Sequence, residues 1–404
     1  MRMLRNGARI LGLLILPLTL RAQTFTVLHN FGSQDQDGMN PPAGVILGLH
    51  GELYGTAKTG GEFGFGTVYE LLPAASSGGT WTEVAIHSFS GQDGQYPDAG
   101  LVRGPSGALY GTAGDSDGNA MVFVLSPPAG GSTFWTETIL YQTPAVDYAY
   151  PGALVFGKER SLYGTYGEFS VYSLTPPSVV GGAWTEATLS NSGIWPVGTL
   201  AVGTDGTLYG ASVSGGNGAC NAGCGMVFSL TPPAAPGAPW TPRLLYTFEP
   251  ETGDGFYPHA GVILAPSGVL YGTTSGGGHG RSGTVFSLTP SAVPDVPMIE
   301  TIVHDFTEIH GDGLSPNASL VLDANGVLYG TTTWGGVAGL GTVFELAPPA
   351  SPGGAWSETV LHSFLGDADG YEPNGIVLGS NGTLYGTTLY GGTSNYGTVF
   401  SLRP

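Results

Sequence analysis

The sequence predicts an all-β fold, a seven-bladed β-propeller built from four-stranded blades around a central axis. The tripeptide Leu-Tyr-Gly recurs every 46 to 62 residues, with its tyrosine at Tyr54, Tyr110, Tyr163, Tyr209, Tyr271, Tyr329 and Tyr385. Four short strand-like runs accompany each copy, and a period of this size with four strands per unit is typical of propeller blades. Seven copies therefore predict seven blades. The phase of the repeat at the two chain ends predicts that the ring closes.

One repeat can be followed from residue 260 to residue 306. The apolar run 260–264 predicts an inner strand, and the Pro-Ser-Gly turn that follows leads to a second strand at 270–274. A glycine-rich loop precedes the third strand, at 284–288, and a proline-containing connection leads to the fourth, at 298–306. In five other units the fourth strand opens with a tryptophan, usually followed by Thr-Glu: Trp81, Trp135, Trp184, Trp240 and Trp356.

The two ends of the repeat region are incomplete in complementary ways. Residues 24–31 match a fourth strand and have no first three strands before them, whereas residues 398–402 match a third strand with no fourth after it. We expect the N-terminal strand to complete the last blade, because this pairing removes two exposed sheet edges and ties down both termini. Residues 23–404 are thus predicted to form one domain.

Residues 1–22 differ in composition from the rest. Arg2, Arg5 and Arg9 precede an apolar stretch at 10–20, and the small residue Ala22 follows. This order is typical of a secretory signal peptide, and the stretch is shorter than the roughly 20 apolar residues of a membrane span. No second apolar segment and no C-terminal anchor follow. We expect a secreted or periplasmic protein, a monomer without membrane insertion after the signal peptide is cleaved.

Charge excludes some partners. Without the four arginines of residues 1–22, seven basic residues remain against 30 acidic ones, a net charge of −23. Such a surface repels phosphate backbones and anionic lipids, so nucleic acid is not expected as a partner. Cations and neutral ligands are compatible with it.

The repeat resembles the GloVer tandem-repeat family, which consists of extracellular bacterial proteins described as "choice-of-anchor". The resemblance covers residues 24–404 and rests on units such as 326–332, followed by Gly335-Gly336 and by 341–346. It implies an extracellular location and supplies no catalytic residue set. The absence of a C-terminal anchor departs from the surface attachment that the family description implies.

The loops between strands two and three and those that join successive blades lie on one face of a propeller. An aspartate recurs there four residues before a proline, at Asp37, Asp93, Asp147, Asp254, Asp312 and Asp369. These carboxylates are predicted to ring one face, as a rim for a polar ligand or for Ca²⁺, which prefers oxygen ligands. The alternative is that each carboxylate only caps backbone N–H groups of its turn.

The residue just before that proline is aromatic in four consecutive units, and glycine-rich loops add two more aromatics to this face. The six residues are Tyr96, Tyr150, Trp195, Tyr257, Trp334 and Tyr390. Aromatic rings beside carboxylates suit carbohydrate, because the apolar faces of sugars stack on rings. The alternative is that these rings pack on the neighbouring proline and blades.

Other recurring residues have structural interpretations. The tyrosine of Leu-Tyr-Gly and the third-strand aromatic are predicted to form the core between blades. His29, His87, His304 and His362 each precede a fourth-strand phenylalanine by two residues and lie in different blades, so a joint metal site is not expected. Cys220 and Cys224, both in the fourth glycine-rich loop, are predicted to form a local disulfide in an exported protein.

The leading functional hypothesis is a non-catalytic binding module for a glycan or another cell-envelope component. The chain contains no Gly-x-Ser-x-Gly, His-Glu-x-x-His or P-loop motif. One alternative is a polysaccharide hydrolase or lyase that uses some of Asp93, Asp147 and Asp254 as acid and base groups. A structural platform for protein interaction is the other, since a fold does not dictate a function.

Overall fold

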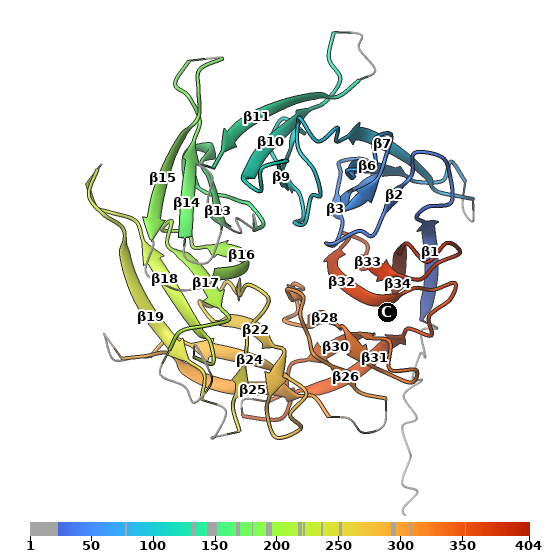
Figure 1. Cartoon of the computed structure of the whole chain (residues 1–404). Coiled ribbons are helices and arrows are strands. Elements are labelled where there is room, and N and C mark those ends of the chain that lie inside the picture. Colours follow the sequence, from blue (N-terminus) through green and yellow to red (C-terminus); the bar gives the residue numbers. More distant parts are fainter. Residues whose placement is uncertain are drawn as a thin grey trace, which may run out of the picture.

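The computed structural model describes residues 23–404 except 77–78, 131–133, 144–151, 167–169, 180, 191–195, 217–219, 221–222, 236, 250–252, 292–295, 308, 310 and 352. Seven four-stranded antiparallel sheets surround a central axis (Figure 1). The described residues contain no α-helix, only a 3-10 turn at Lys158–Arg160. The predicted seven-bladed propeller is therefore confirmed. The predicted signal peptide, residues 1–22, lies outside the described residues.

Each blade is an antiparallel meander whose first strand lies nearest the axis. In blades 1 to 3 the strands are β3 (Ile46–Leu47), β4 (Leu53–Ala57), β6 (Thr67–Leu72), β7 (Thr82–Ser88); β8 (Val102–Arg103), β9 (Leu109–Gly114), β10 (Ala120–Ser126), β11 (Thr136–Gln142); and β12 (Val155–Phe156), β13 (Leu162–Tyr166), β14 (Ser170–Thr175), β15 (Thr185–Ser190). In blades 4 and 5 they are β16 (Pro196–Val202), β17 (Leu208–Ser212), β18 (Met226–Thr231), β19 (Thr241–Thr247); and β21 (Ile263–Leu264), β22 (Leu270–Thr274), β24 (Thr284–Thr289), β25 (Ile299–Asp305).

In blades 6 and 7 the strands are β27 (Val321–Leu322), β28 (Leu328–Thr332), β30 (Thr342–Ala347), β31 (Ser357–Ser363); and β32 (Tyr371–Leu378), β33 (Leu384–Tyr390), β34 (Thr398–Arg403), β1 (Thr24–Asn30). Three small two-stranded sheets join the interblade connection to the glycine-rich loop: β2 (Gly38–Met39) with β5 (Thr59–Gly60), β20 (Gly255–Phe256) with β23 (Gly276–Gly277), and β26 (Gly313–Leu314) with β29 (Trp334–Gly335).

The inner strands differ most from the sequence prediction. The expected strand at 260–264 is regular only at Ile263–Leu264. Its first residues lie against the backbone of blade 4, where a Cβ on Gly261 would be 1.9 Å from the Thr199 carbonyl oxygen. Close approach of two blades, which only glycine permits here, replaces ladder pairing near the axis.

Packing within a blade explains the Leu-Tyr-Gly motif. All seven leucines are fully buried, from Leu53 in blade 1 to Leu384 in blade 7. Each glycine lies opposite the aromatic residue of the third strand, as Gly330 does opposite Phe344. A Cβ on Gly330 would lie 2.5 Å from that ring. Glycine is therefore required because the aromatic ring occupies the space where its side chain would be.

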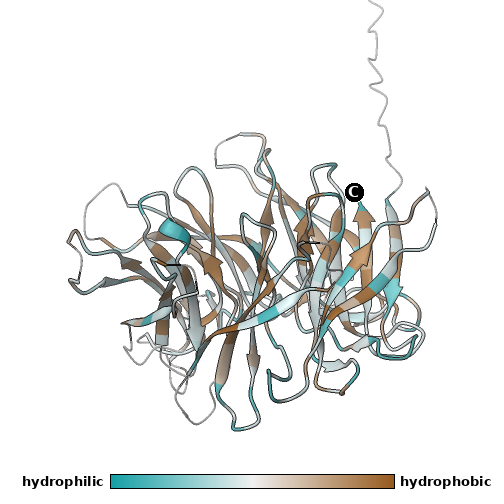
Figure 2. Ribbon diagram, turned by 90° about the horizontal axis from the view of Figure 1, so that it is seen from above, coloured by the Kyte–Doolittle hydropathy of each residue, from teal (hydrophilic) through white to brown (hydrophobic). Residues whose placement is uncertain are grey.

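Packing between blades explains the tyrosine of the motif and the tryptophan of the fourth strand. Tyr54 of blade 1 packs edge-on against Trp135 of blade 2, with ring centroids 5.8 Å apart. The same pair recurs at four other interfaces, as Tyr110–Trp184, Tyr163–Trp240, Tyr271–Trp356 and Tyr385–Trp81. Figure 2 shows the hydrophobic residues concentrated along the strands. The predicted packing of the Leu-Tyr-Gly tyrosine between blades is present at these five interfaces.

A hydrogen bond also joins neighbouring blades near the axis. The threonine after Leu-Tyr-Gly donates its hydroxyl to a carbonyl of the next inner segment, as Thr331 does to Asn374 at 2.9 Å. Thr56 and Thr387 make the equivalent bonds, to Ala99 and to Ala43. The last of these links blade 7 to blade 1.

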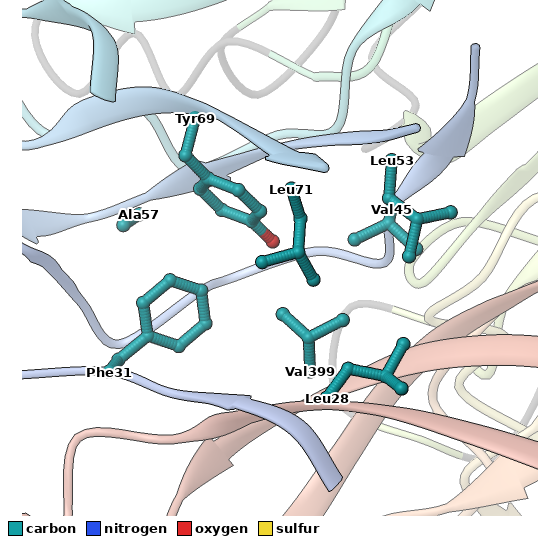
Figure 3. Packing of buried hydrophobic residues seen from close by; sticks show 8 residues of the cluster. All are labelled: Leu28, Phe31, Val45, Leu53, Ala57, Tyr69, Leu71 and Val399. Atoms are coloured by element: carbon teal, nitrogen blue, oxygen red, sulfur yellow. The ribbon is translucent and has the colours of Figure 1, made fainter. Parts of the chain in front are cut away.

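The N-terminal strand closes the ring as predicted. β1 pairs antiparallel with β34, from Thr24 opposite Arg403 to Asn30 opposite Thr398. The residues around this closure form one cluster between blades 7 and 1 (Figure 3). In that cluster Phe31 packs edge-on against Tyr69, at 5.1 Å between ring centroids, and both rings are fully buried. The first and the last strand of the propeller are thus held by the same sheet that completes the core.

Candidate functional site

An axial cavity of about 590 Å³ lies at the centre of the ring, and all seven blades contribute to its wall. The wall begins at the residues that follow the repeated proline and continues along the first strands. Most of it is backbone and small side chains, such as Gly44, Gly100 and Ala318. Its polar side chains are Asp98, Thr199, His259, Asn317, Ser319, Thr333 and Asn374.

An ion pair and hydrogen bonds hold three polar side chains of the cavity wall in place. The Lys58 ammonium lies 2.7 Å from a carboxylate oxygen of Asp98. The Asn374 amide donates to the Pro41 carbonyl oxygen at 2.7 Å, and the Asn317 amide donates to the Thr333 hydroxyl at 3.0 Å. These bonds orient the amides while leaving carbonyl and hydroxyl lone pairs open to a ligand.

The repeated aspartates lie at the interblade connections, and the five described ones accept hydrogen bonds within their own connection. The donors are backbone N–H groups 2.7 to 3.1 Å away: Ser33 for Asp37, Ser90 for Asp93, Glu249 for Asp254, Thr307 for Asp312 and Leu365 for Asp369. None of the five lines the axial cavity. Asp147 lies outside the described residues. Capping of the turn therefore accounts for these contacts, and binding of Ca²⁺ or a ligand stays a prediction.

Three of these carboxylates also bond directly to the fourth strand before them. His29 Nε2 lies 3.2 Å from Asp37, and His362 Nε2 lies 3.1 Å from Asp369. The Tyr246 hydroxyl donates to Asp254 at 2.8 Å. Each of the four recurring histidines therefore lies beside the aspartate of its own interface.

The four described aromatic residues of the predicted ligand platform stand outside the cavity wall. Tyr96 and Trp334 are about two-fifths exposed, whereas Tyr257 and Tyr390 are half-buried. Tyr96 contacts Phe65 with ring centroids 6.0 Å apart, and Tyr257 packs edge-on against Phe256. Tyr390 stacks on Tyr371 at 5.4 Å. Tyr150 and Trp195 lie outside the described residues, and the role of the six in ligand binding stays a prediction.

Two of these aromatics, Tyr96 and Tyr257, share an unusual backbone conformation. The residue before the repeated proline has a positive φ in the five described blades with this connection, at Asn40, Tyr96, Tyr257, Ser315 and Glu372. The N–H of Tyr257 bonds to the Cys224 carbonyl of the preceding blade, and its own carbonyl accepts from Ser275 of the same blade. This left-handed conformation is strained before a proline and is held by the hydrogen bonds on both sides.

The predicted disulfide between Cys220 and Cys224 is present, with Cα atoms 5.1 Å apart. Cys224 is fully buried and packs in the cluster that contains Phe248 and Phe286. Because the Cys224 carbonyl also accepts the N–H of Tyr257, the bridge stiffens the loop that positions one rim aromatic.

Sequence reasoning missed a set of glutamates that are largely but not fully buried between blades. Glu83, Glu137, Glu300 and Glu358 occupy equivalent fourth-strand positions, each opposite a third-strand leucine. Burial raises their pKa to about 8 for Glu83 and Glu137 and to about 7 for Glu300 and Glu358. The negative charge of the nearest rim aspartate, such as Asp37 beside Glu83, adds to this rise. The glutamate of the Thr-Glu pair that follows the fourth-strand tryptophan recurs in the sequence, and this recurrence could have indicated the set.

The fold and the cavity define a closed propeller of tandem repeats with a polar axial cavity. The model of the Gloeobacter/Verrucomicrobia repeat matches residues 5–170 and 196–404, and the chain therefore belongs to this repeat family. No curated protein matches it. No helix of the described residues is long and apolar enough to cross a membrane.

Solved structures with this fold are similar only at low identity. One is PorZ, a bacterial surface component of the type-IX secretion system of Porphyromonas gingivalis, with 15% identity and a TM-score of 0.54 over 92% of this chain and 47% of that one. Another is a carbohydrate-active enzyme of family AA12 from Trichoderma reesei, with 11% identity and a TM-score of 0.47 over 94% and 96%. These likenesses describe the fold alone.

Proposed function

We propose that this propeller is a non-catalytic binding module whose axial cavity and surrounding loop face recognise a neutral, polyhydroxylated ligand, such as a glycan of the cell envelope. The observation that carries this proposal is the composition of the cavity wall. Asn317, Ser319, Thr333 and Asn374 present amides and hydroxyls, and backbone groups fill the space between them. Such groups form the hydrogen bonds that sugar hydroxyls require.

The wall favours binding over hydrolysis. Hydrolysis of a glycosidic bond normally needs two carboxyl groups facing the substrate. Among the cavity-lining residues that the structure describes, Asp98 is the single carboxylate, and it is ion-paired with Lys58. Asp93 and Asp254, which an enzyme was expected to use, cap turns outside the wall. A binding role requires no such pair.

The aromatic rim extends the proposed site. Trp334 and Tyr96 expose ring surface on the face formed by the loops between strands two and three and between blades. Rings in that place add stacking surfaces to the hydrogen-bonding cavity. A chain of several sugars is therefore a better fit than a single ring-sized molecule.

A glycan array probed with residues 23–404 tests the proposal. We expect a reproducible hit that Asn317→Ala and Trp334→Ala weaken at least tenfold, because each removes ligand contacts while leaving the strands intact. Phe134→Ala is the matched control, since Phe134 is exposed on a loop between strands three and four at the opposite face. A blank array, or equal loss in the control, contradicts the proposal. Release of shortened sugar that Asp93→Asn abolishes would instead support an enzyme.

The compartment is part of the proposal. Residues 1–22 carry the charge order of a signal peptide, and the disulfide in the fourth glycine-rich loop suits an oxidising environment. We expect the chain to be exported and cut near Ala22. The mass of the protein recovered outside the cytoplasm measures this, and an intact N-terminus on cytoplasmic protein contradicts it.

A further inference from the structure

Two blade interfaces each gather an imidazole and two carboxylates. Between blades 1 and 2 these are His87, Asp93 and Glu137, and between blades 5 and 6 they are His304, Asp312 and Glu358. In each triad the histidine and the aspartate come from one blade and its connection, whereas the glutamate comes from the fourth strand of the next blade. One ligand atom from each residue lies within 4.8 Å of the others.

The separations within the triads are too long for hydrogen bonds. His87 Nε2 lies 3.6 Å from Asp93 and 3.7 Å from Glu137. Metal–ligand bonds of about 2.0–2.2 Å place the ligand atoms of a tetrahedral ion about 3.3–3.6 Å apart. The two histidine–carboxylate separations are therefore close to the spacing of ligands around a common ion, and the carboxylate oxygens lie within 4.8 Å of each other.

The second triad repeats this geometry. His304 Nε2 lies 3.6 Å from Asp312 and 3.9 Å from Glu358. The two triads are three interfaces apart in the ring, so each is an independent instance of one arrangement.

Some atoms of each triad are sealed from solvent and lack hydrogen-bond partners. They are Nε2 of His87 and of His304, Oε1 of Glu137, and Oε1 of Glu358, whose other oxygen lies nearest His304. The two aspartates already accept backbone N–H groups of their own connections. Buried polar atoms without a partner are costly, and native structures rarely retain them without compensation. When both carboxyl groups of a triad are ionised beside a neutral imidazole, their charge of −2 is one that a divalent cation neutralises.

We propose that each triad binds one divalent transition-metal ion of the Zn²⁺ type, which ties two neighbouring blades together. One imidazole nitrogen and two carboxylate oxygens are a ligand set that such ions accept, with water completing the coordination. Three ligands with a nitrogen among them do not suit Ca²⁺, which takes six to eight oxygen ligands.

Two other interfaces between neighbouring blades lack the triad of one histidine, one aspartate and one glutamate. At the interface of blades 6 and 7, Phe25 replaces the glutamate and stacks on His362 with ring centroids 3.8 Å apart, while His362 bonds directly to Asp369. At the interface of blades 4 and 5, Tyr246 replaces the histidine. The two proposed sites thus differ from these two interfaces, and His362 supplies a matched control.

The test measures the metal content of residues 23–404 after incubation with ZnCl₂ and removal of free ion in high salt, which displaces weakly held surface cations. We expect two zinc ions per chain, one in Glu137→Gln, one in Glu358→Gln and none in the double variant. His362→Gln should retain both. Thermal melting identifies any variant that does not fold.

A second measurement reports the coordination geometry of the bound metal ion and does not depend on how much metal is bound. Co²⁺ in place of Zn²⁺ should give the intense visible absorption of a low-coordinate ion, and the double variant should lose it. Absence of stoichiometric zinc from the unaltered chain overturns the proposal. Unchanged zinc content in a folded double variant, or loss of zinc in His362→Gln, does so as well.

Discussion

Replacing Glu83 by glutamine should change how the stability of the ring depends on pH. Glu83 lies on β7, and its Oε1 atom is buried without a hydrogen-bond partner. Burial and the nearby charge of Asp37 raise the pKa of its carboxyl group from 4.5 to about 8. Glutamine has almost the same shape as protonated glutamate and does not titrate. The substitution therefore isolates the loss of folding stability that ionisation of Glu83 causes at this interface.

The sign of the effect follows from the raised pKa. Because the folded chain binds this proton more tightly than the unfolded chain, the carboxyl group contributes its full stability below about pH 4.5. That contribution is lost as the pH rises toward 8. The shift corresponds to at most about 5 kcal/mol in the free energy of unfolding, at 1.36 kcal/mol per pKa unit. Water reaching the partly buried side chain reduces the loss, so we expect about 2–5 kcal/mol.

Urea unfolding across this pH range measures the difference between Glu83→Gln and the unaltered chain. We expect the variant to gain relative stability steadily from about pH 5 to about pH 8. Glu52→Gln is the control, because backbone N–H groups lower the pKa of Glu52 and its effect belongs to the acid range. Parallel stability curves for Glu83→Gln and the unaltered chain would refute the reasoning, since they would show that this carboxylate is solvated at the interface.

Three further changes have expected effects on the free energy of urea unfolding. Replacing Cys220 and Cys224 by serine should cost about 2 kcal/mol, the chain entropy of a five-residue loop, and reductant should then affect only the unaltered chain. Thr331→Val should cost about 1–2 kcal/mol, because the Asn374 carbonyl loses its donor, and Thr331→Ser should restore most of it. Ser315→Val should cost about 1–3 kcal/mol at the left-handed position, whereas Ser315→Gly stays within about 1 kcal/mol; equal losses would contradict the strain argument.

Much of the fold was predictable because the repeat signals are local. The leucine and glycine of Leu-Tyr-Gly report a buried strand packed under an aromatic ring, and this requirement is the same in all seven blades. The incomplete repeats at the two ends predicted the pairing of β1 with β34, since an unpaired strand and an open edge each need a partner. The inner strands were overestimated because their apolar pattern does not reveal that glycines such as Gly261 replace pairing by close contact between blades.

The sequence by itself determined the number of blades, the closure, the disulfide and the residue types at the loop face. Tertiary structure alone decided which of these residues meet. It placed Asn317 and Asn374 in the axial cavity and left Tyr96 and Tyr257 outside its wall, in a backbone conformation that the following proline normally disfavours. It also brought Glu137 beside His87 from the preceding repeat. Spacing along one chain encodes the blade, whereas contacts between blades depend on the curvature of the closed ring.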